Sequence, residues 1–595
     1  MTQTEIKKQI ESVIQNMPND WLKLTTHRLD IYNEELAKTE FIDQFLKGKS
    51  LELLPTAYDY IRLGHPLSCI LEWGIAENKS VSVNNVISFS SQTMPLMAIL
   101  RKSHFEGSKV QIVNAEMLPK SFDMDLVKNV YGYESELVEE LDPEFKGHSV
   151  ALSGFKEAWS DQVLEADFII YLHKELGSVV VANLDTYVSE IQHVRRRESI
   201  AMTPHDCFNV LREFIGNKEY NVIKVDRFEL DKTIQKITNT SGPVGIGSCG
   251  LSAQYAIMMG LIEHALNVHP GKEVKFIVPP NCYGGTNDQA RRVAACLDHV
   301  EIIDLKVDSG NDMVDGIDHI LEELSKTNAV PYIIAEIPTN PRVEVPDLER
   351  LKKVLSKERK TSEGETAIES VFILDQTFCP DTQFLGEGDY LGSSKALSYV
   401  SGSKFPSGGL CTAGYVVANE LAIEYMDYVQ RHLEICDNGA TTFQIKTLTE
   451  QMPSMVERIK AAYKNTREFV SFIEETLPES KINFVPSEVV DAGFTPSVFS
   501  LDLPTRGESA EERELNKREL NQKLINLMIN EIPGGSKHCV SYGQLKGSYW
   551  TIPATSTQGT TKEGDKDYIV RVSMSPEVDL AKHKEVFKKF CTLNY

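Results

Sequence analysis

The chain has 595 residues, of which 41% are hydrophobic and 25% are charged, and its formal net charge is −24. This length predicts two or three domains, and the composition is typical of a soluble globular protein. The strong negative charge argues against nucleic acid as a partner, because phosphate backbones bind to clustered positive charge.

Signals for targeting, membranes and metals are missing from the sequence. The first twenty residues, MTQTEIKKQIESVIQNMPND, lack the apolar centre of a signal peptide, and no apolar run reaches the roughly 18 residues of a membrane span. The ten cysteines are scattered without a CxxC pair, which favours reduced thiols over disulfides or a zinc site. We therefore expect a cytoplasmic protein with no membrane partner and no metal.

Residues 1–190 give the weakest pattern. They contain strand-like pieces such as NNVISFS (84–90) and GSVVVANL (177–184), together with helix-like pieces. We expect a folded extra N-terminal region of unknown role. It shows no clear repeat, and no motif in it indicates chemistry.

The segment from 191 to 420 alternates between apolar, β-branched runs and helix-like stretches. Alternation of this kind predicts an α/β fold with a mainly parallel sheet covered on both faces, which we assign as the large domain. Ligands of such sheets bind at the carboxyl ends of the strands, so the residues that follow each strand matter most. The expected strands are EVKFIVP (273–279), VEIIDL (300–305), YIIAEI (332–337), VFILD (371–375), ALSYV (396–400) and GYVVA (414–418).

The character of the sequence changes after residue 420. Amphipathic helices such as MVERIKAAYKNTREFVSFIEETL (455–477) come first, and strand-like runs TPSVFSLDLP (495–504) and DYIVRVSMS (567–575) follow. We expect a smaller α+β C-terminal domain from 421 to 595.

A glycine motif precedes one of the helix-like stretches. GIGSCG (245–250) fits G-x-G-x-x-G, but the next strand lacks the acidic end that a dinucleotide site requires. A glycine turn at a helix start still exposes N–H groups and the positive end of the helix dipole, which suits a phosphate. The candidate donors are Cys249, Gly250 and Leu251, and the plain alternative is a tight turn without a ligand.

Four polar side chains follow successive strands of the predicted sheet: Tyr283 in YGGT, Asn340 in EIPTNP, Asp375 in LDQTF and Lys404 in SGSKF. Each one alone is more often a turn former, a packing residue or a solvated group. Their joint appearance suits pyridoxal 5′-phosphate. This cofactor needs a lysine for its aldehyde, a carboxylate for its pyridine nitrogen and donors for its phosphate.

These needs predict a role for each residue. Lys404 would bind the aldehyde, Asp375 would face the pyridine nitrogen and Tyr283 would stack on the ring. Asn340 would bond the 3′-oxygen, while Ser401 and Ser403 would join residues 249–251 at the phosphate. The competing lysine, Lys395, precedes its strand, and we expect it at the opposite edge of the sheet.

The same runs, in the same order, resemble the Cys/Met-metabolism family of pyridoxal-phosphate enzymes, which includes cystathionine γ-synthase and the cystathionine lyases. The resemblance covers about 200–595 and implies an aspartate-aminotransferase-like fold of type I. It implies that Arg571 in IVRVSMSPEVD grips the substrate carboxylate, with Ser541 in SYGQ lining the same pocket. It also places Thr377 among the cofactor-binding residues and gives Tyr283 a proton-handling role.

The chain departs from the family pattern in two places. CGLSA (249–253) replaces the Ser-Gly-Met form of the phosphate run, and the amino-terminal Tyr-x-Arg that reaches a neighbouring subunit's phosphate is not recognisable. HVRRRES (193–199) is a candidate replacement without an assigned arginine. Because the family builds its site across a subunit boundary, the resemblance implies a homodimer or homotetramer.

The implied function is γ-replacement on an activated homoserine by a thiol, as in cystathionine γ-synthase, with small amino acids and thiols as substrates. A cystathionine β- or γ-lyase and an O-acetylhomoserine sulfhydrylase remain open, since the same residues serve these reactions. Two further alternatives are another pyridoxal enzyme on the same fold, and a catalytically weak relative with a regulatory or assembly role.

Overall fold

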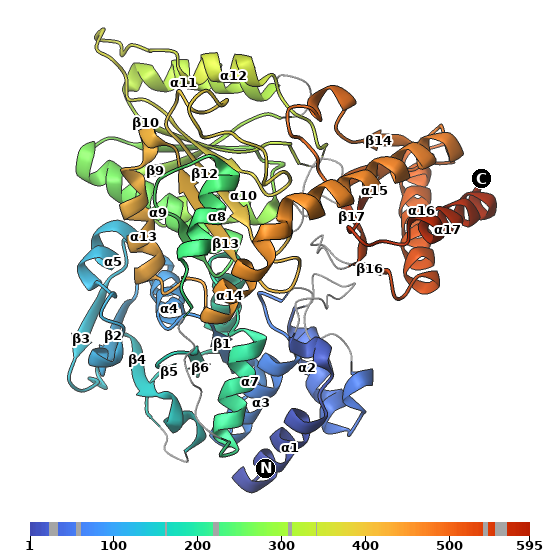
Figure 1. Ribbon diagram of the computed structural model, residues 1–595. Helices are drawn as coiled ribbons and strands as arrows, with labels where there is room; N and C mark the ends of the chain where they lie inside the picture. The colour runs from blue at the N-terminus through green and yellow to red at the C-terminus, as the bar shows by residue number, and fades with distance from the viewer. Residues whose placement is uncertain are drawn as a thin grey trace.

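The structure is a computed structural model that describes residues 1–22, 34–54, 61–160, 164–217, 225–307, 312–340, 342–538, 546–553 and 568–595. Its strands form three sheets, which follow one another along the chain (Figure 1). The N-terminal sheet lies below the central sheet in Figure 1, and the C-terminal domain lies beside both. None of the described helices combines the length and the apolar character that a bilayer crossing requires.

The N-terminal sheet has six strands in the order β1-β6-β5-β4-β2-β3. β1 and β6 pair antiparallel, as do β6 and β5, whereas the remaining pairs are parallel. Its strands are β1 (Val86–Phe89), β2 (Lys109–Val113), β3 (Ser135–Val138), β4 (Gly147–Gly154), β5 (Phe168–His173) and β6 (Gly177–Ala182).

Helices cover both faces of this sheet and so bury its central strands on both sides. α4 and α6 pack together on one face, and α3 and α7 pack with α1 on the other. The helices are α1 (Gln3–Asn16), α2 (Glu34–Leu46), α3 (Pro66–Lys79), α4 (Met94–Phe105), α5 (Met124–Tyr131), α6 (Asp185–Arg197) and α7 (Pro204–Phe214).

A buried ion cluster ties four of these elements together. The Glu72 carboxylate of α3 lies 2.5 Å from Lys38 Nζ of α2 and 2.7 Å from Arg195 Nη1 of α6. It also accepts hydrogen bonds from the N–H and hydroxyl of Ser88 in β1, at 2.8 and 2.7 Å. Burial alone would raise the pKa of Glu72, but Lys38 and Arg195 outweigh it and lower the pKa to about 2.

The central sheet has seven strands in the order β7-β13-β12-β11-β10-β8-β9. Strands β9 to β12 and β8 run parallel, whereas β13 is antiparallel to both of its neighbours. The strands are β7 (Gly245–Gly247), β8 (Val274–Val278), β9 (Val300–Asp304), β10 (Val330–Glu336), β11 (Val371–Asp375), β12 (Ala396–Ser401) and β13 (Gly414–Ala418). The predicted α/β class with a mainly parallel sheet is therefore confirmed, and all six predicted strands are present.

The helices of the central unit lie on both faces of the sheet (Figure 1). α9 and α13 pack against each other on the face that meets the N-terminal unit. The helices are α8 (Phe228–Thr238), α9 (Gly250–Val268), α10 (Gly284–Ala294), α11 (Asp312–Thr327), α12 (Leu348–Leu355), α13 (Tyr425–Ile435) and α14 (Thr442–Gln451).

The C-terminal unit is a five-stranded sheet in the order β14-β15-β18-β17-β16 with three long helices, as the smaller α+β domain predicted. An apolar core joins its strands to its helices. Its elements are α15 (Met455–Thr476), β14 (Lys481–Asn483), β15 (Val498–Asp502), α16 (Ala510–Glu531), β16 (Ser536–His538), β17 (Gly547–Pro553), β18 (Tyr568–Ser573) and α17 (Leu580–Asn594).

The ion cluster makes Glu72 a test of what holds the N-terminal unit together. Glu72→Gln removes the negative charge and leaves Lys38 and Arg195 buried with uncompensated positive charge. We expect a loss of roughly 3–5 kcal/mol in the free energy of unfolding, measured by urea denaturation. Glu323→Gln, which breaks an exposed pair with Lys326, should cost less than about 1 kcal/mol. Equal losses for the two variants would contradict the role of the cluster.

Candidate active site

The carboxyl end of the central sheet gathers acidic and aromatic side chains. The parallel register sets Glu336, the last residue of β10, beside Asp375, the last residue of β11. Asp375 in turn lies beside Tyr399 of β12. Sequence analysis predicted Asp375 but missed Glu336, because its position inside a run of apolar letters resembles an ordinary strand residue.

Lys404 lies in the turn that follows β12, on the same edge of the sheet. Its side chain is buried, and its Nζ donates to Ser401 Oγ at 3.2 Å. The Ser401 N–H donates to Thr377 Oγ1 at 2.9 Å, and the Thr377 N–H donates to Asp375 Oδ1 at 3.0 Å. The predicted lysine and the predicted carboxylate are therefore linked through two hydroxyl residues.

The two carboxyl groups share a buried environment that disfavours negative charge. Burial raises the pKa of Asp375, and hydrogen bonds from Thr377 and Tyr399 together with the charge of Lys404 offset only part of that rise. Burial and the neighbouring Asp375 raise the pKa of Glu336 to about 8. Buried carboxyl groups of this kind are stabilised by a cationic partner, which is what a protonated pyridine nitrogen would supply.

Tyr283 comes from the loop between β8 and α10 and reaches the same edge. Its N–H donates to Glu336 Oε1 at 2.8 Å. Its hydroxyl accepts a hydrogen bond from Arg62 Nη2 at 2.9 Å. Burial would raise the pKa of the Tyr283 phenol, but the positive charges of Arg62 and Lys404 outweigh burial and lower it.

The start of α9 lies against the lysine turn. Cys249 is the N-cap of this helix, and its N–H donates to Ser252 Oγ at 2.9 Å. Within the described part of the chain, the N–H groups of Gly250 and Leu251 have no acceptor and lie at the positive end of the helix dipole. A Cβ at Gly250 would lie 3.0 Å from Ser401 Cα, so glycine allows this close approach. Of the three predicted phosphate-binding residues, Gly250 and Leu251 therefore keep backbone N–H groups that can donate to an anion.

The remaining predicted residues differ in how they relate to this edge. Arg571 of β18 is buried with its guanidinium 5.5 Å from the centre of the Phe378 ring, and its charge acts to lower the pKa of Glu336. The Asn340 side chain acts to lower the pKa of Glu336. Ser403 is buried in the lysine turn. Ser541 lies outside the described residues.

The competing lysine and the arginine run have other partners. Lys395 immediately precedes β12 and lies 3.3 Å from Glu424, at the opposite end of the strand from Lys404, as expected. Within HVRRRES, Arg195 belongs to the Glu72 cluster and Arg197 Nε lies 2.8 Å from Asp288.

Arg62 is the site residue that sequence analysis missed in the N-terminal region. Its side chain is 4% exposed, and its carbonyl accepts from the Ala201 N–H at 2.7 Å, which fixes it beside the end of α6. The sequence does contain a signal, since Tyr60-Ile61-Arg62 fits the Tyr-x-Arg pattern. Residues 1–190, where the sequence indicates no chemistry, therefore contribute Arg62 as a contact of the Tyr283 hydroxyl.

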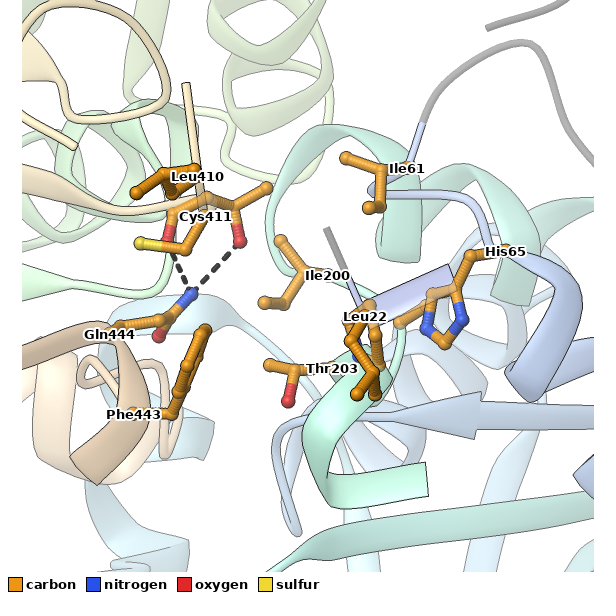
Figure 2. A pocket seen from close by; sticks show the side chains of 12 residues that line it. Leu22, Ile61, His65, Ile200, Thr203, Leu410, Cys411, Phe443 and Gln444 are labelled. Atoms are coloured by element: carbon orange, nitrogen blue, oxygen red, sulfur yellow. Dashed lines mark hydrogen bonds between the residues drawn. The ribbon is translucent and has the colours of Figure 1, made fainter. Parts of the chain in front are cut away.

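A hollow opens beside these groups where the N-terminal and central units meet (Figure 2). Ile61, His65 and Ile200 line it from the N-terminal side, and Leu410 and Phe443 line it from the central side. Its volume is about 360 Å³, including the part open to solvent. In Figure 2 the Gln444 amide donates to Thr412 O and Oγ1, at 2.6 and 2.9 Å, and so fixes the chain that leads from Lys404 to β13.

Comparison with known proteins gives no sequence match, because neither a protein-family profile nor a curated protein matches the chain. Several solved structures are similar to it at low sequence identity. The methionine gamma lyase of Micromonospora echinospora is 16% identical with a TM-score of 0.44, over 61% of this chain and 85% of its own. Cystathionine gamma synthase of Xanthomonas oryzae pv. oryzae is 17% identical with a TM-score of 0.45, over 64% and 90%. Cystathionine gamma-lyase from yeast is 16% identical with a TM-score of 0.46, over 63% and 89%.

A glycine-to-alanine substitution, which adds one methyl group, tests the contact between α9 and β13. A Cβ at Gly414 would lie 2.4 Å from the Cys249 carbonyl oxygen, so Gly414→Ala must displace the start of α9 from the lysine turn. We expect the variant to lose roughly 1–3 kcal/mol of stability, measured by chemical denaturation. Gly439→Ala, which meets no atom within 4 Å, is the matched control and should unfold like the wild type. An unchanged Gly414→Ala protein would contradict this packing.

The raised pKa of Glu336 predicts a pH dependence of stability. Between its ordinary value of 4.5 and about 8, the folded chain holds a proton at Glu336 that the unfolded chain has released. Stability should therefore fall as the pH rises through this window. Glu336→Gln should flatten the fall in urea midpoints measured from pH 5 to pH 8. The exposed Glu363→Gln should leave the slope as it is. A slope that Glu336→Gln does not alter would show that Glu336 ionises normally in the folded protein.

Proposed function

We propose that this protein is a pyridoxal-phosphate-dependent enzyme of sulfur amino acid metabolism that acts like a cystathionine γ-synthase. The observation that carries the proposal is the linked set at one sheet edge, in which Lys404 and Asp375 are joined through Ser401 and Thr377 beside Tyr283. These residues come from separate strands and loops, and each supplies a group that the cofactor requires.

The residues present fit the cofactor. Lys404 would hold its aldehyde carbon, and Asp375 would face its ring nitrogen in a buried setting that favours a cationic partner. The ring of Tyr283 is available for stacking, and the N–H groups of Gly250 and Leu251 suit a phosphate together with Ser401. When bound, the cofactor would supply an electron sink for the α-carbon of an amino acid.

The chain's own groups would bind the substrate and move its protons. The buried guanidinium of Arg571 suits a carboxylate, which it can bind through two parallel hydrogen bonds. The Lys404 amine is the base that would take a proton from the α-carbon and return one further along the substrate. Tyr283 has a lowered pKa and would handle a proton near the leaving group.

The particular reaction within this group is part of the proposal. We propose γ-replacement of an activated homoserine by a thiol, with small amino acids and thiols as ligands, in the cytoplasm. Pockets for the substrate side chain would decide between replacement and elimination, so a cystathionine lyase or a sulfhydrylase is a defined outcome of the assay below. The homodimer or homotetramer expected from the sequence also stays a prediction.

The cofactor and the reaction are tested on purified protein. Bound cofactor should give visible absorption that borohydride bleaches, and a protein that stays colourless with added cofactor would refute the proposal. An O-acyl-homoserine with cysteine should yield cystathionine. Breakdown of cystathionine alone would indicate a lyase, and homocysteine from inorganic sulfide would indicate a sulfhydrylase.

Lys404→Ala should abolish turnover, because it removes the amine that would hold the cofactor and move protons. Lys395→Ala is the matched control, since Lys395 lies at the other end of β12, and it should retain activity. Full activity in Lys404→Ala would refute the assignment of the lysine.

A further inference from the structure

The N-terminal and central sheets share one topology. In both, an edge strand pairs antiparallel with the last strand of the unit (β1 with β6, β7 with β13). The last strand is antiparallel to a run of parallel strands, and the third strand of the unit forms the far edge. The N-terminal sheet has the same order with one strand fewer. The sequence of residues 1–190 shows no clear repeat, and the likeness of the two units is one of strand order.

The helices and turns repeat as well. In each unit the helix after the first strand packs on the helix after the last strand: α4 on α6, and α9 on α13. In each unit, the residue that follows the first strand donates its N–H to a backbone carbonyl. That carbonyl lies three residues beyond the end of the helix that follows the last strand. Ser90 donates to Ile200 at 3.1 Å, and Ser248 donates to Asn438 at 2.8 Å. A shared offset of this kind supports common descent of the two units over a chance likeness of sheets.

The two units also meet reciprocally. α5 of the first contacts α13 of the second, with Tyr131 Oη 2.7 Å from His432 Nδ1. The corresponding α10 of the second contacts α6 of the first, with Asp288 Oδ2 2.7 Å from His193 Nε2.

Equivalent segments touch each other at the centre of this contact. Ser199 Oγ donates to Asn438 Oδ1 at 2.7 Å, and Asn438 Nδ2 donates to the Glu198 carbonyl at 2.8 Å. Contacts in which patch i meets patch j and j meets i are those of a two-fold dimer.

Among its described residues, the first unit has no counterpart of the lysine turn. Only residues 174–176 join β5 to β6, whereas residues 402–413, with Lys404 among them, join β12 to β13. Gly154 ends β4 at the place where Glu336 ends β10. The first unit nevertheless contributes Arg62, which lies just before α3 and bonds the Tyr283 hydroxyl of the second.

We propose that residues 61–200 are a shortened internal copy of the large domain that takes the place of a partner subunit and completes the candidate site in cis through Arg62. This inference rests on the proposed function for the identity of the ligand, but not for the duplication or for the contact between Arg62 and Tyr283. The chain is then a single-site unit, and any homo-oligomer forms through other faces, because the copy covers the surface around α9, α10 and α13.

The test asks whether Arg62 acts on Tyr283 of its own chain. Arg62→Ala should raise the pKa of the Tyr283 phenol, read by ultraviolet titration of the cofactor-free protein against Tyr283→Phe as the blank. Arg62→Lys should keep part of the effect, and Arg212→Ala, on the neighbouring helix α7, should have none. Arg62→Ala should also weaken pyridoxal phosphate binding by roughly 10–100-fold, measured by absorbance.

Chains that carry Arg62→Ala are then co-expressed with chains that carry Tyr283→Phe, each with its own affinity tag. Only the Arg62→Ala chain of the hybrid has Tyr283, so under the proposal its phenol keeps the raised pKa. If no doubly tagged species forms, the chain is a monomer, and the effect of Arg62→Ala in that monomer establishes action in cis. Return of the wild-type phenol pKa in the hybrid would overturn the proposal, as would an Arg62→Ala chain that titrates like the wild type. A wild-type protein that titrates as expected but binds no pyridoxal phosphate would instead refute the proposed function alone.

Discussion

The site depends on the parallel register of β10, β11 and β12. This register ends neighbouring strands on Glu336 and Asp375, two carboxyl groups that burial makes costly to ionise. Other groups at this edge offset the cost of ionising the two carboxyl groups. Lys404 and Arg571 bring positive charge from a turn and from another domain, and Thr377 and Tyr283 donate backbone hydrogen bonds. A site with this charge distribution suits a ligand that has a cationic ring and an anionic tail.

The junction between the N-terminal and central units has a second role beyond stability. It places Arg62 on Tyr283, and it forms the hollow that Ile61 and Leu410 line from opposite sides. The Glu72 cluster stabilises α6, whose end holds the Arg62 backbone through Ala201. The N-terminal unit therefore contacts the candidate site through Arg62.

The central sheet was predictable because its strands are buried on both faces and read as continuous apolar runs, such as VFILD before Asp375. Lys404 and Tyr283 were predictable because each follows a strand at a glycine-rich turn. Glu336 was not, since a carboxyl inside an apolar run gives no local signal of its partners. The N-terminal copy was not predictable either, because its repeat is one of strand order, and strand order is set by contacts between residues far apart in sequence. Arg62 belongs to a short Tyr-x-Arg motif. A motif of this length is too unspecific to identify a site residue without the contact between Arg62 and Tyr283.

The proposed function requires that one buried amine at this edge, that of Lys404, hold the cofactor aldehyde. The most direct measurement is to incubate the protein with pyridoxal phosphate, reduce it with borohydride, digest it and map the modified lysine by mass spectrometry. The account predicts a single adduct on Lys404. An adduct on Lys395 or on another lysine, with Lys404 unmodified, would contradict it.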